Sequence, residues 1–366
     1  MNIFQKLYHK DLEKVYKRFD GIILDNVIGD IPDLQAYFED LRKNISPKKD
    51  KILISYHNPS WEPILTLASK LGLRKKVGIQ NWLDQTDLKN ILDLSGFEIV
   101  SSDKRFFGIT TITITKPKKQ IPRTTNQYSV SIIIPAKNEE GNIGKIIPSI
   151  PKFGKWQEII FVEGNSADKT WGEIVKITDH KIRPTLKLRR TRQTGRGKAD
   201  AVKLGFKKAT GDILMIYDAD RTVAASDLPK FYNALAGGTG QFINGSRLVY
   251  PMEKDAMQSL NKIGNNFFGT LFTWILGTRF KDTLCGTKAL CRCDFIKYKR
   301  DYNRYLKTDP FGDFALIFTA IKHNLKVVEI PVRYKERVYG STNINRFKHG
   351  LLLFKMAAQA FLEFKI

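Results

Sequence analysis

Cysteine is scarce in this sequence, and the three cysteines lie close together at Cys285, Cys291 and Cys293. Three clustered cysteines cannot all pair within one chain, so the pattern favours a reducing compartment over a disulfide framework. A zinc site is not expected either, because no fourth ligand stands at a suitable spacing.

Long apolar runs are also missing. No stretch reaches the roughly 18 uninterrupted apolar residues of a transmembrane helix, and residues 1–6 lack the apolar core of a signal peptide. No Lys/Arg block in the sequence looks like a nucleic-acid arm, and no helix-turn-helix, zinc-finger or RNA-motif signature appears. We therefore expect no nucleic-acid partner.

Acidic residues are few relative to basic ones. The 366 residues include 61 Lys and Arg against 37 Asp and Glu, a formal charge of +24. Residues 1–127 carry 21 basic and 15 acidic residues, and residues 128–366 carry 40 and 22, a net +18. A basic surface suits an anionic membrane or phosphorylated ligands once nucleic acid is set aside. The length predicts two or three domains.

Residues 1–115 alternate between strand-like and helix-like segments, an α/β pattern. Expected strands are 21–24, 51–56, 97–100 and 110–114, and expected helices are 31–45, 61–71 and 85–94. Two prolines and a charge cluster mark 116–128 as a linker.

The first segment resembles the C-terminal half of a class I S-adenosylmethionine-dependent methyltransferase. The resemblance covers about residues 18–115 and is carried by residues 20–28, 46–55 and 92–98. The Gly-rich turn that holds the cofactor in that family is missing, since no Gly-x-Gly-x-x-Gly precedes residue 100. We therefore expect a remnant or truncated domain that binds no S-adenosylmethionine; the alternative is a plain α/β accessory domain.

A second domain is expected at 129–345. Strands are predicted at 130–135, 158–162, 186–188 and 213–217. One helix is expected to start near Asn142, a second after Thr170, and a third is expected to run through Phe206. Strand and helix in alternation predict an α/β fold with a mostly parallel sheet and helices on both faces.

The strand at 213–217 ends in Asp218 and Asp220, with one residue between them. Side chains at i and i+2 of an extended chain point to the same side. The two carboxylates can therefore project together beyond the strand end, where open α/β sheets bind ligands. Clustered carboxylates favour a hard divalent cation on phosphate oxygens, and the alternative is a solvated turn.

Residues 129–348 resemble the family 2 glycosyltransferases, which have the A-type nucleotide-sugar fold, and are most similar to the dolichyl- or polyprenyl-phosphate sugar transferases. Ordered motifs carry the resemblance: the loop after 130–135, the Asp-x-Asp pair, residues 244–247, which are expected to follow a further strand, and residues 281–288 and 330–342. Glu163 stands where the family has the first of two aspartates, and Gly164 replaces the second.

The resemblance implies roles for individual residues. It places Mg²⁺ or Mn²⁺ on Asp218 and Asp220. It implies acceptor contacts for Asp282 and Lys288, and catalytic roles for Asp220, Arg247 and Asp313, the last as a base. The donor-binding residues would be Pro135, Asn138, Glu139, Glu163, Gly195, Gly197, Asp218, Asp220, Arg247 and Arg337.

Structural alternatives stand beside several of these roles. Asp282 and Lys288 would instead form a surface ion pair, and Asp313 would cap the helix expected at 314–323. Gly195 and Gly197 would belong to a plain loop. Asp168 and Thr170 are expected to cap a helix rather than contact ligand.

Residues 346–366 read as a basic amphipathic helix of the kind that lies on a membrane, with a terminal helix packed on the domain as the alternative. The sequence thus predicts a metal-dependent, inverting glycosyltransferase at the cytoplasmic membrane face. Its acceptor would be a polyprenyl phosphate or a glycan hydroxyl. The rival class is a non-catalytic protein that binds nucleotide sugars or membranes.

Overall fold

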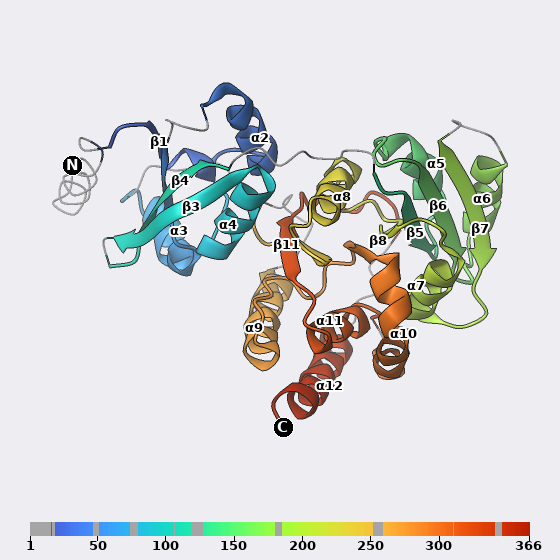
Figure 1. Ribbon diagram of the computed structural model, residues 1–366. Helices are drawn as coiled ribbons and strands as arrows, with labels where there is room; N and C mark the ends of the chain where they lie inside the picture. Colours follow the sequence, from blue (N-terminus) through green and yellow to red (C-terminus); the bar gives the residue numbers. More distant parts are fainter. Residues whose placement is uncertain are drawn as a thin grey trace. The chain divides into compact units, whose positions relative to one another are not determined.

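The computed structural model describes residues 16, 19–46, 51–73, 80–105, 107–118, 127–179, 185–251, 259–309, 311–340 and 346–366 (Figure 1). The chain divides into two compact units. Unit 1 is Met1–Pro122 with Val249–Pro251, and unit 2 is Arg123–Leu248 with Met252–Ile366. Most of the expected linker, residues 119–126, lies outside the described residues.

The described residues of unit 1 form a four-stranded sheet and three α-helices, as the α/β pattern predicted. The strand order is β1-β2-β4-β3, with β1 parallel to β2 and β4 antiparallel to both of its neighbours. The elements are β1 (Ile22–Asp25), η1 (Val27–Gly29), α2 (Leu34–Asn44), β2 (Ile52–His57), η2 (Pro59–Trp61), α3 (Glu62–Lys70), α4 (Gln85–Leu94), β3 (Phe97–Arg105) and β4 (Thr110–Pro117).

Two features of unit 1 differ from the prediction. Strand β4 continues through Pro117, so the first two residues of the expected linker belong to the sheet. Val249 and Tyr250, distant in sequence, are buried in the core of this unit. The backbone N–H of Leu34 donates to the hydroxyl of Tyr250 at 3.2 Å, and no local sequence pattern encodes that contact.

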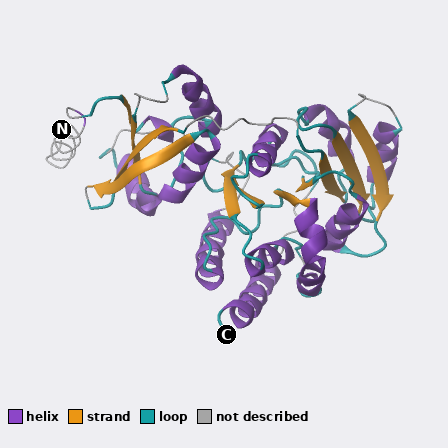
Figure 2. Ribbon diagram, viewed as in Figure 1, coloured by secondary structure: helices purple, strands orange, loops and turns teal. Residues whose placement is uncertain are grey.

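Unit 2 contains a seven-stranded sheet in the order β11-β9-β10-β8-β5-β6-β7 (Figure 2). Only β10 among these strands runs antiparallel to its neighbours β8 and β9; the other pairings are parallel. The strands are β5 (Val130–Ala136), β6 (Gln157–Glu163), β7 (Leu186–Arg192), β8 (Ile213–Ile216), β9 (Phe242–Ser246), β10 (Lys288–Cys291) and β11 (Val327–Pro331). The mostly parallel sheet is as predicted.

Helices connect and cover these strands. They are α5 (Glu140–Ser149), α6 (Thr170–Thr178), α7 (Gly197–Lys208), η3 (Ala225–Asp227), α8 (Leu228–Ala236), α9 (Ser259–Leu276), α10 (Arg292–Leu306), α11 (Phe314–Lys322) and α12 (Arg346–Phe364). Helices α9, α11 and α12 lie side by side (Figure 1). Within the described part of the chain, no helix is both long enough and apolar enough to cross a membrane.

Helix α12 packs on unit 2, as the alternative interpretation of the C-terminal segment proposed. Leu353, Met356, Ala357 and Ala360 are buried in the core of this unit. The opposite side of the helix remains exposed, including Leu351. Helix α12 therefore packs on the domain through one side, and its other side stays exposed to solvent.

Two strand predictions need correction. Strand β7 runs over seven residues, to Arg192, because an edge strand can direct charged side chains to solvent and so lacks the apolar run that marks a buried one. Asn244 lies inside β9 rather than after it, since it pairs with Lys288 of β10 and Glu329 of β11. The parallel strands β5, β6 and β8 all end at one edge, and the site is built there.

Candidate functional site

The Asp-x-Asp pair follows β8 at this edge, and each of its carboxylates faces a cation. The Nζ of Lys198, on the first turn of α7, lies 2.6 Å from Oδ1 of Asp218. Burial opposes charge on Lys198, but the carboxylates of Asp218, Asp313 and Asp220 together raise its pKa above the usual range. The ammonium of Lys198 therefore interacts with both carboxylates of the Asp-x-Asp pair and with Asp313, which lies far from them in sequence.

Asp220 is held by a second cation, which comes from the segment after β11. Nη2 of Arg337 lies 2.9 Å from Oδ2 of Asp220, and Nη1 lies 3.0 Å from Oε1 of Glu139. The other oxygen of Asp220 accepts hydrogen bonds from the backbone N–H and the hydroxyl of Thr222, at 3.1 and 2.9 Å. A single guanidinium therefore joins the loop after β5 to the loop after β8.

The loop after β5 is fixed by its neighbours. Glu139 is buried, and burial raises the pKa of its carboxyl. Its backbone N–H donates to the hydroxyl of Thr170 at 2.8 Å. Asp168 accepts from the backbone N–H groups of Thr170 and Glu140, at 3.0 and 3.2 Å. The predicted capping role holds only in part: Asp168 accepts from the first backbone N–H of α6, but Lys169 occupies the N-cap position and Thr170 lies inside the helix.

Asp313 and Lys288 form a buried pair, with Nζ and Oδ1 2.9 Å apart. Lys288 is fully buried and also donates to the carbonyl of Cys285. Asp313 occupies the N-cap position of α11, as its structural alternative proposed, but its carboxylate makes no capping hydrogen bond. Asp309 accepts from the backbone of Phe311 and Ala315 instead, at 2.9 and 2.8 Å, and burial raises its pKa to about 6.

Arg247 and Asp282 form a second buried pair. Nε and Nη2 of Arg247 lie 2.7 and 2.8 Å from the two carboxylate oxygens, and its backbone N–H donates to the same carboxylate at 3.0 Å. Burial would raise the pKa of Asp282, but Arg247 holds it below its usual range. The surface ion pair considered for Asp282 and Lys288 is therefore wrong: each is buried, with a different partner.

The segment 281–288 approaches the Asp-x-Asp pair through Gly286. A Cβ atom on Gly286 would collide with the carboxylate of Asp218 and the ammonium of Lys198. Glycine at this position therefore leaves room for the ion pair of Lys198 and Asp218, which a Cβ atom would displace. The expected acceptor loop and the expected donor carboxylate therefore lie against one another.

A family model described as glycosyl transferase family 2 matches residues 131–303. Unit 2 contains a family 2 glycosyltransferase domain. The sheet with its antiparallel β10 has the A-type fold that the resemblance implied. A methyltransferase-domain model matches residues 2–102, in agreement with the resemblance of the first segment. The family 2 glycosyltransferase domain supports the prediction that the chain is an enzyme.

Curated relatives align with the glycosyltransferase domain. Glycosyltransferase AglJ of Haloferax volcanii is 27% identical over 229 residues, which are 62% of this chain and 70% of the relative. Dolichol-phosphate mannosyltransferase of Pyrococcus furiosus is 27% identical over 222 residues, 59% of each chain. Dolichyl-phosphate hexose transferase of Haloferax volcanii is 25% identical over 64% of this chain and 94% of its own length.

Among solved structures, the chain is similar to a mannosyltransferase of Pyrobaculum calidifontis in complex with GDP-Man and Mn²⁺. The two are 19% identical, the match covers 66% of this chain and 68% of that one, and the TM-score is 0.45.

The donor set at the end of β8 suits a hard divalent cation. Asp218 and Asp220 offer carboxylate oxygens, the ligands that Mg²⁺ and Mn²⁺ prefer. Lys198 pairs with Asp218 and Arg337 pairs with Asp220. The two carboxylates therefore already attract positive charge to this end of β8. Asp218 and Asp220 are the residues of the glycosyltransferase domain that would hold the metal.

The remaining predicted donor residues lie on the neighbouring loops. Glu163 ends β6 and is engaged, since Ser166 N–H donates to it at 2.5 Å and Nε of Arg192 lies 3.5 Å away. Asn138 adopts φ of 56° and its side chain accepts from Ala167 N–H at 2.8 Å. Pro135, Gly195 and Gly197 lie at the end of β5 and the start of α7. Their contact with donor stays a prediction.

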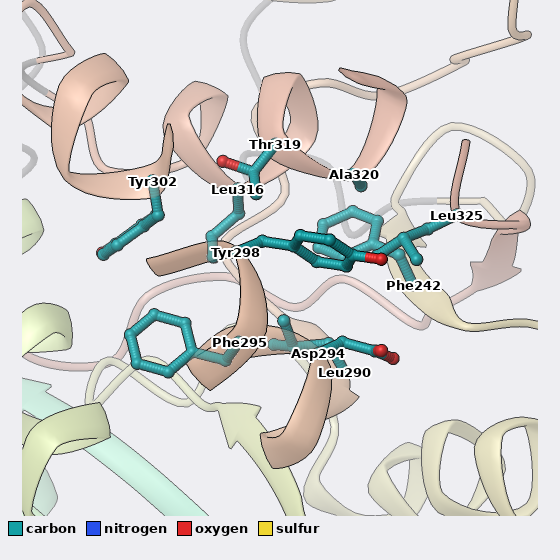
Figure 3. Close-up of a pocket in the computed structure, with 10 residues that line it drawn as sticks. All are labelled: Phe242, Leu290, Asp294, Phe295, Tyr298, Tyr302, Leu316, Thr319, Ala320 and Leu325. Atoms are coloured by element: carbon teal, nitrogen blue, oxygen red, sulfur yellow. The ribbon is translucent and has the colours of Figure 1, made fainter. Parts of the chain in front are cut away.

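Lys198 belongs to the cluster of charges at the end of β8, and the sequence analysis did not name it. It directly follows the predicted Gly197, so a cation beside a glycine loop was the available signal. A cavity elsewhere in the domain, lined by residues of β9, β10, α10 and α11, has a volume of about 10 Å³ (Figure 3). That is room for about one water molecule, and no predicted site residue lines it.

Proposed function

We propose that the glycosyltransferase domain transfers a sugar from a nucleoside-diphosphate sugar to a phosphate oxygen of a polyprenyl phosphate, by a metal-dependent, inverting displacement. The observation that carries this proposal is the arrangement of Asp218 and Asp220 with Lys198 and Arg337 at one sheet edge. The two carboxylates can bind a divalent cation, and the lysine and arginine beside them can bind phosphate groups.

The donor side of this site matches the charge that develops during transfer. The leaving nucleoside diphosphate gains negative charge as the glycosidic bond breaks, and preorganised positive groups stabilise it. Arg337 and Lys198 would supply such groups from the protein, and their present carboxylate partners keep them in place. Mg²⁺ or Mn²⁺, when bound, would neutralise diphosphate oxygens.

The acceptor side favours a lipid phosphate over a glycan hydroxyl. A phosphate oxyanion attacks without a general base, whereas a hydroxyl needs one. Asp313, the candidate base, is occupied by the buried ammonium of Lys288. The names of the Pyrococcus furiosus and second Haloferax volcanii relatives also refer to dolichol or dolichyl phosphate.

A lipid acceptor requires contact with a bilayer, and helices α9 and α12 offer a surface for it. We define the α9/α12 face as the exposed apolar side chains Ile263, Phe267, Trp274, Leu351, Phe354 and Leu362. The rings of Phe267 and Phe354 lie 6.0 Å apart, which joins the two helices. Lys355 is exposed beside Phe354, as on helices that lie on anionic membranes. We propose peripheral attachment at the cytoplasmic face.

The direct test is a transfer assay with the purified full-length chain. Labelled mannose, glucose and N-acetylglucosamine nucleotide donors would be incubated with Mn²⁺ and polyprenyl phosphate in anionic vesicles, and in parallel with an oligosaccharide. We expect label in the extracted lipid, with the anomeric configuration opposite to that of the donor. Transfer to the oligosaccharide alone would overturn the lipid-phosphate acceptor, and a retained configuration would overturn the displacement.

A further inference from the structure

A second cluster of ligand-type side chains lies at the far end of β10 from the transfer site. Lys288 begins this strand and Cys291 ends it, a separation of about 10 Å at roughly 3.3 Å per residue. Helix α10 begins at Arg292, so Cys293 and Asp294 lie on its first turn. The junction of β10 and α10 therefore carries two thiols and a carboxyl within four consecutive residues.

These three side chains converge. The two Sγ atoms and a carboxylate oxygen of Asp294 all lie within 4.8 Å of one another. In a tetrahedral site with Zn–S bonds of about 2.3 Å, ligand atoms lie roughly 3.8 Å apart. Small rotations of three side chains would therefore complete three positions of a tetrahedron. Cys293 is exposed, which leaves the fourth position open to water.

The surroundings of the cluster favour a cation. Cys291 and Asp294 are half-buried and Cys293 is exposed, so the three ligand atoms meet at the surface, where an ion can reach them. Among the described residues Asp294 accepts no hydrogen bond, although Lys297 lies near enough to interact electrostatically. Asp294 also borders the small cavity beside Leu290 and Phe295 (Figure 3). Three ligand atoms within 4.8 Å of one another can bind a single cation, and metal binding would displace the protons of the two thiols.

The ligand types select the metal. Thiolates are soft ligands and favour Zn²⁺ over Mg²⁺ or Mn²⁺, which prefer oxygen. We propose that Cys291, Cys293 and Asp294 bind one Zn²⁺ ion, with water in the remaining position, and so join the end of β10 to the start of α10. This site is separate from Asp218 and Asp220 and does not depend on the reaction that they serve.

Cobalt(II) titration of the full-length, reduced, metal-stripped chain tests the proposal, because thiolate-to-cobalt charge-transfer absorption reports cysteine ligation alone. Cobalt at Asp218 and Asp220 would have only oxygen ligands and would not contribute. We expect one cobalt-thiolate site per chain, displaced by one equivalent of Zn²⁺. Cys293→Ser should abolish the absorption. Asp294→Asn should weaken Zn²⁺ affinity at least tenfold. The control Asp103→Asn, an exposed aspartate of unit 1, should change neither.

Three results would overturn the proposal. One is an absence of charge-transfer absorption in the wild-type chain. Another is unchanged Zn²⁺ affinity in Asp294→Asn. The third is a Cys291–Cys293 disulfide that persists under reductant, seen by mass spectrometry. Cys293 is exposed, so its serine variant should fold, and circular dichroism would verify this before the titration is read. Buried Cys285 remains in every variant as an internal control.

Discussion

Lys198 and Asp218 form an ion pair of 2.6 Å at the end of β8, which places a cation on the first carboxylate of the Asp-x-Asp pair. Asp220 and Asp313 also raise the pKa of this lysine. Asp218 holds this ammonium in place, and we propose that the ammonium faces the donor phosphates from there.

Lys198→Met should lower kcat/KM for the nucleotide donor about 100-fold, the scale for loss of one preorganised electrostatic contact. Initial rates at varied donor concentration measure this. Lys203→Met, at an exposed position of the same helix, is the matched control and should change kcat/KM less than twofold. Equal effects of the two substitutions would remove Lys198 from the donor site.

Asp313→Asn separates the two acceptor chemistries. With a lipid phosphate, which is already ionised, kcat should change little and the acceptor KM should rise, because the partner of Lys288 loses its charge. With a hydroxyl acceptor, loss of a general base would cost about 10²- to 10⁴-fold. Kinetics with polyprenyl phosphate decide the matter: a 100-fold fall in kcat at saturating lipid would contradict our proposal for the acceptor.

Arg247→Met should destabilise unit 2 by about 3–5 kcal/mol, because it leaves the Asp282 carboxylate buried without its partner. Urea unfolding monitored by tryptophan fluorescence measures the loss. Arg190→Met breaks a partly exposed pair with Asp179 and should cost at most about 1 kcal/mol. If Arg247→Met unfolds like the wild type yet loses transfer, the guanidinium serves ligand contact rather than the structure.

Membrane attachment should depend on the α9/α12 face rather than on the whole of α12, which also packs in the core. Leu351→Ser with Phe354→Ser should weaken sedimentation with anionic vesicles, and added salt should weaken it further. The matched control is Ile64→Ser with Leu67→Ser, two exposed apolar residues of α3 in unit 1. Unchanged sedimentation of the first variant would contradict attachment through this face.

Local patterns in the sequence predicted most of the fold. The buried strands β5, β6 and β8 are short apolar runs, and the strand-end position of Asp218 and Asp220 follows from them. The predicted strand 186–188 is shorter than β7, because the charged residues of this edge strand interrupt the apolar pattern that marks a buried strand. The burial of Val249 and Tyr250 in unit 1 depends on long-range packing that periodicity cannot reveal.

The sequence identified the charged residues of the candidate site but not which of them form ion pairs with one another. Arg247 and Asp282 were assigned to donor and acceptor, yet they bond to each other across 35 positions of sequence. Lys288 and Asp313 likewise meet only because β10 and the start of α11 are adjacent in space. Ion pairs of this kind depend on the tertiary fold, and the sequence contains the charges but not their partners.

The central claim, metal-dependent sugar transfer at the Asp-x-Asp pair, is tested most directly by Asp220→Asn. The asparagine is isosteric, so the fold should persist while one ligand charge is lost. Donor-dependent transfer would be measured with Mn²⁺ and again after chelation, beside Asp179→Asn as an exposed control. We predict that wild type and control lose activity on chelation, and that Asp220→Asn is at least about 100-fold slower with Mn²⁺ present. Full activity of Asp220→Asn, or wild-type transfer that is indifferent to chelation, would contradict the account.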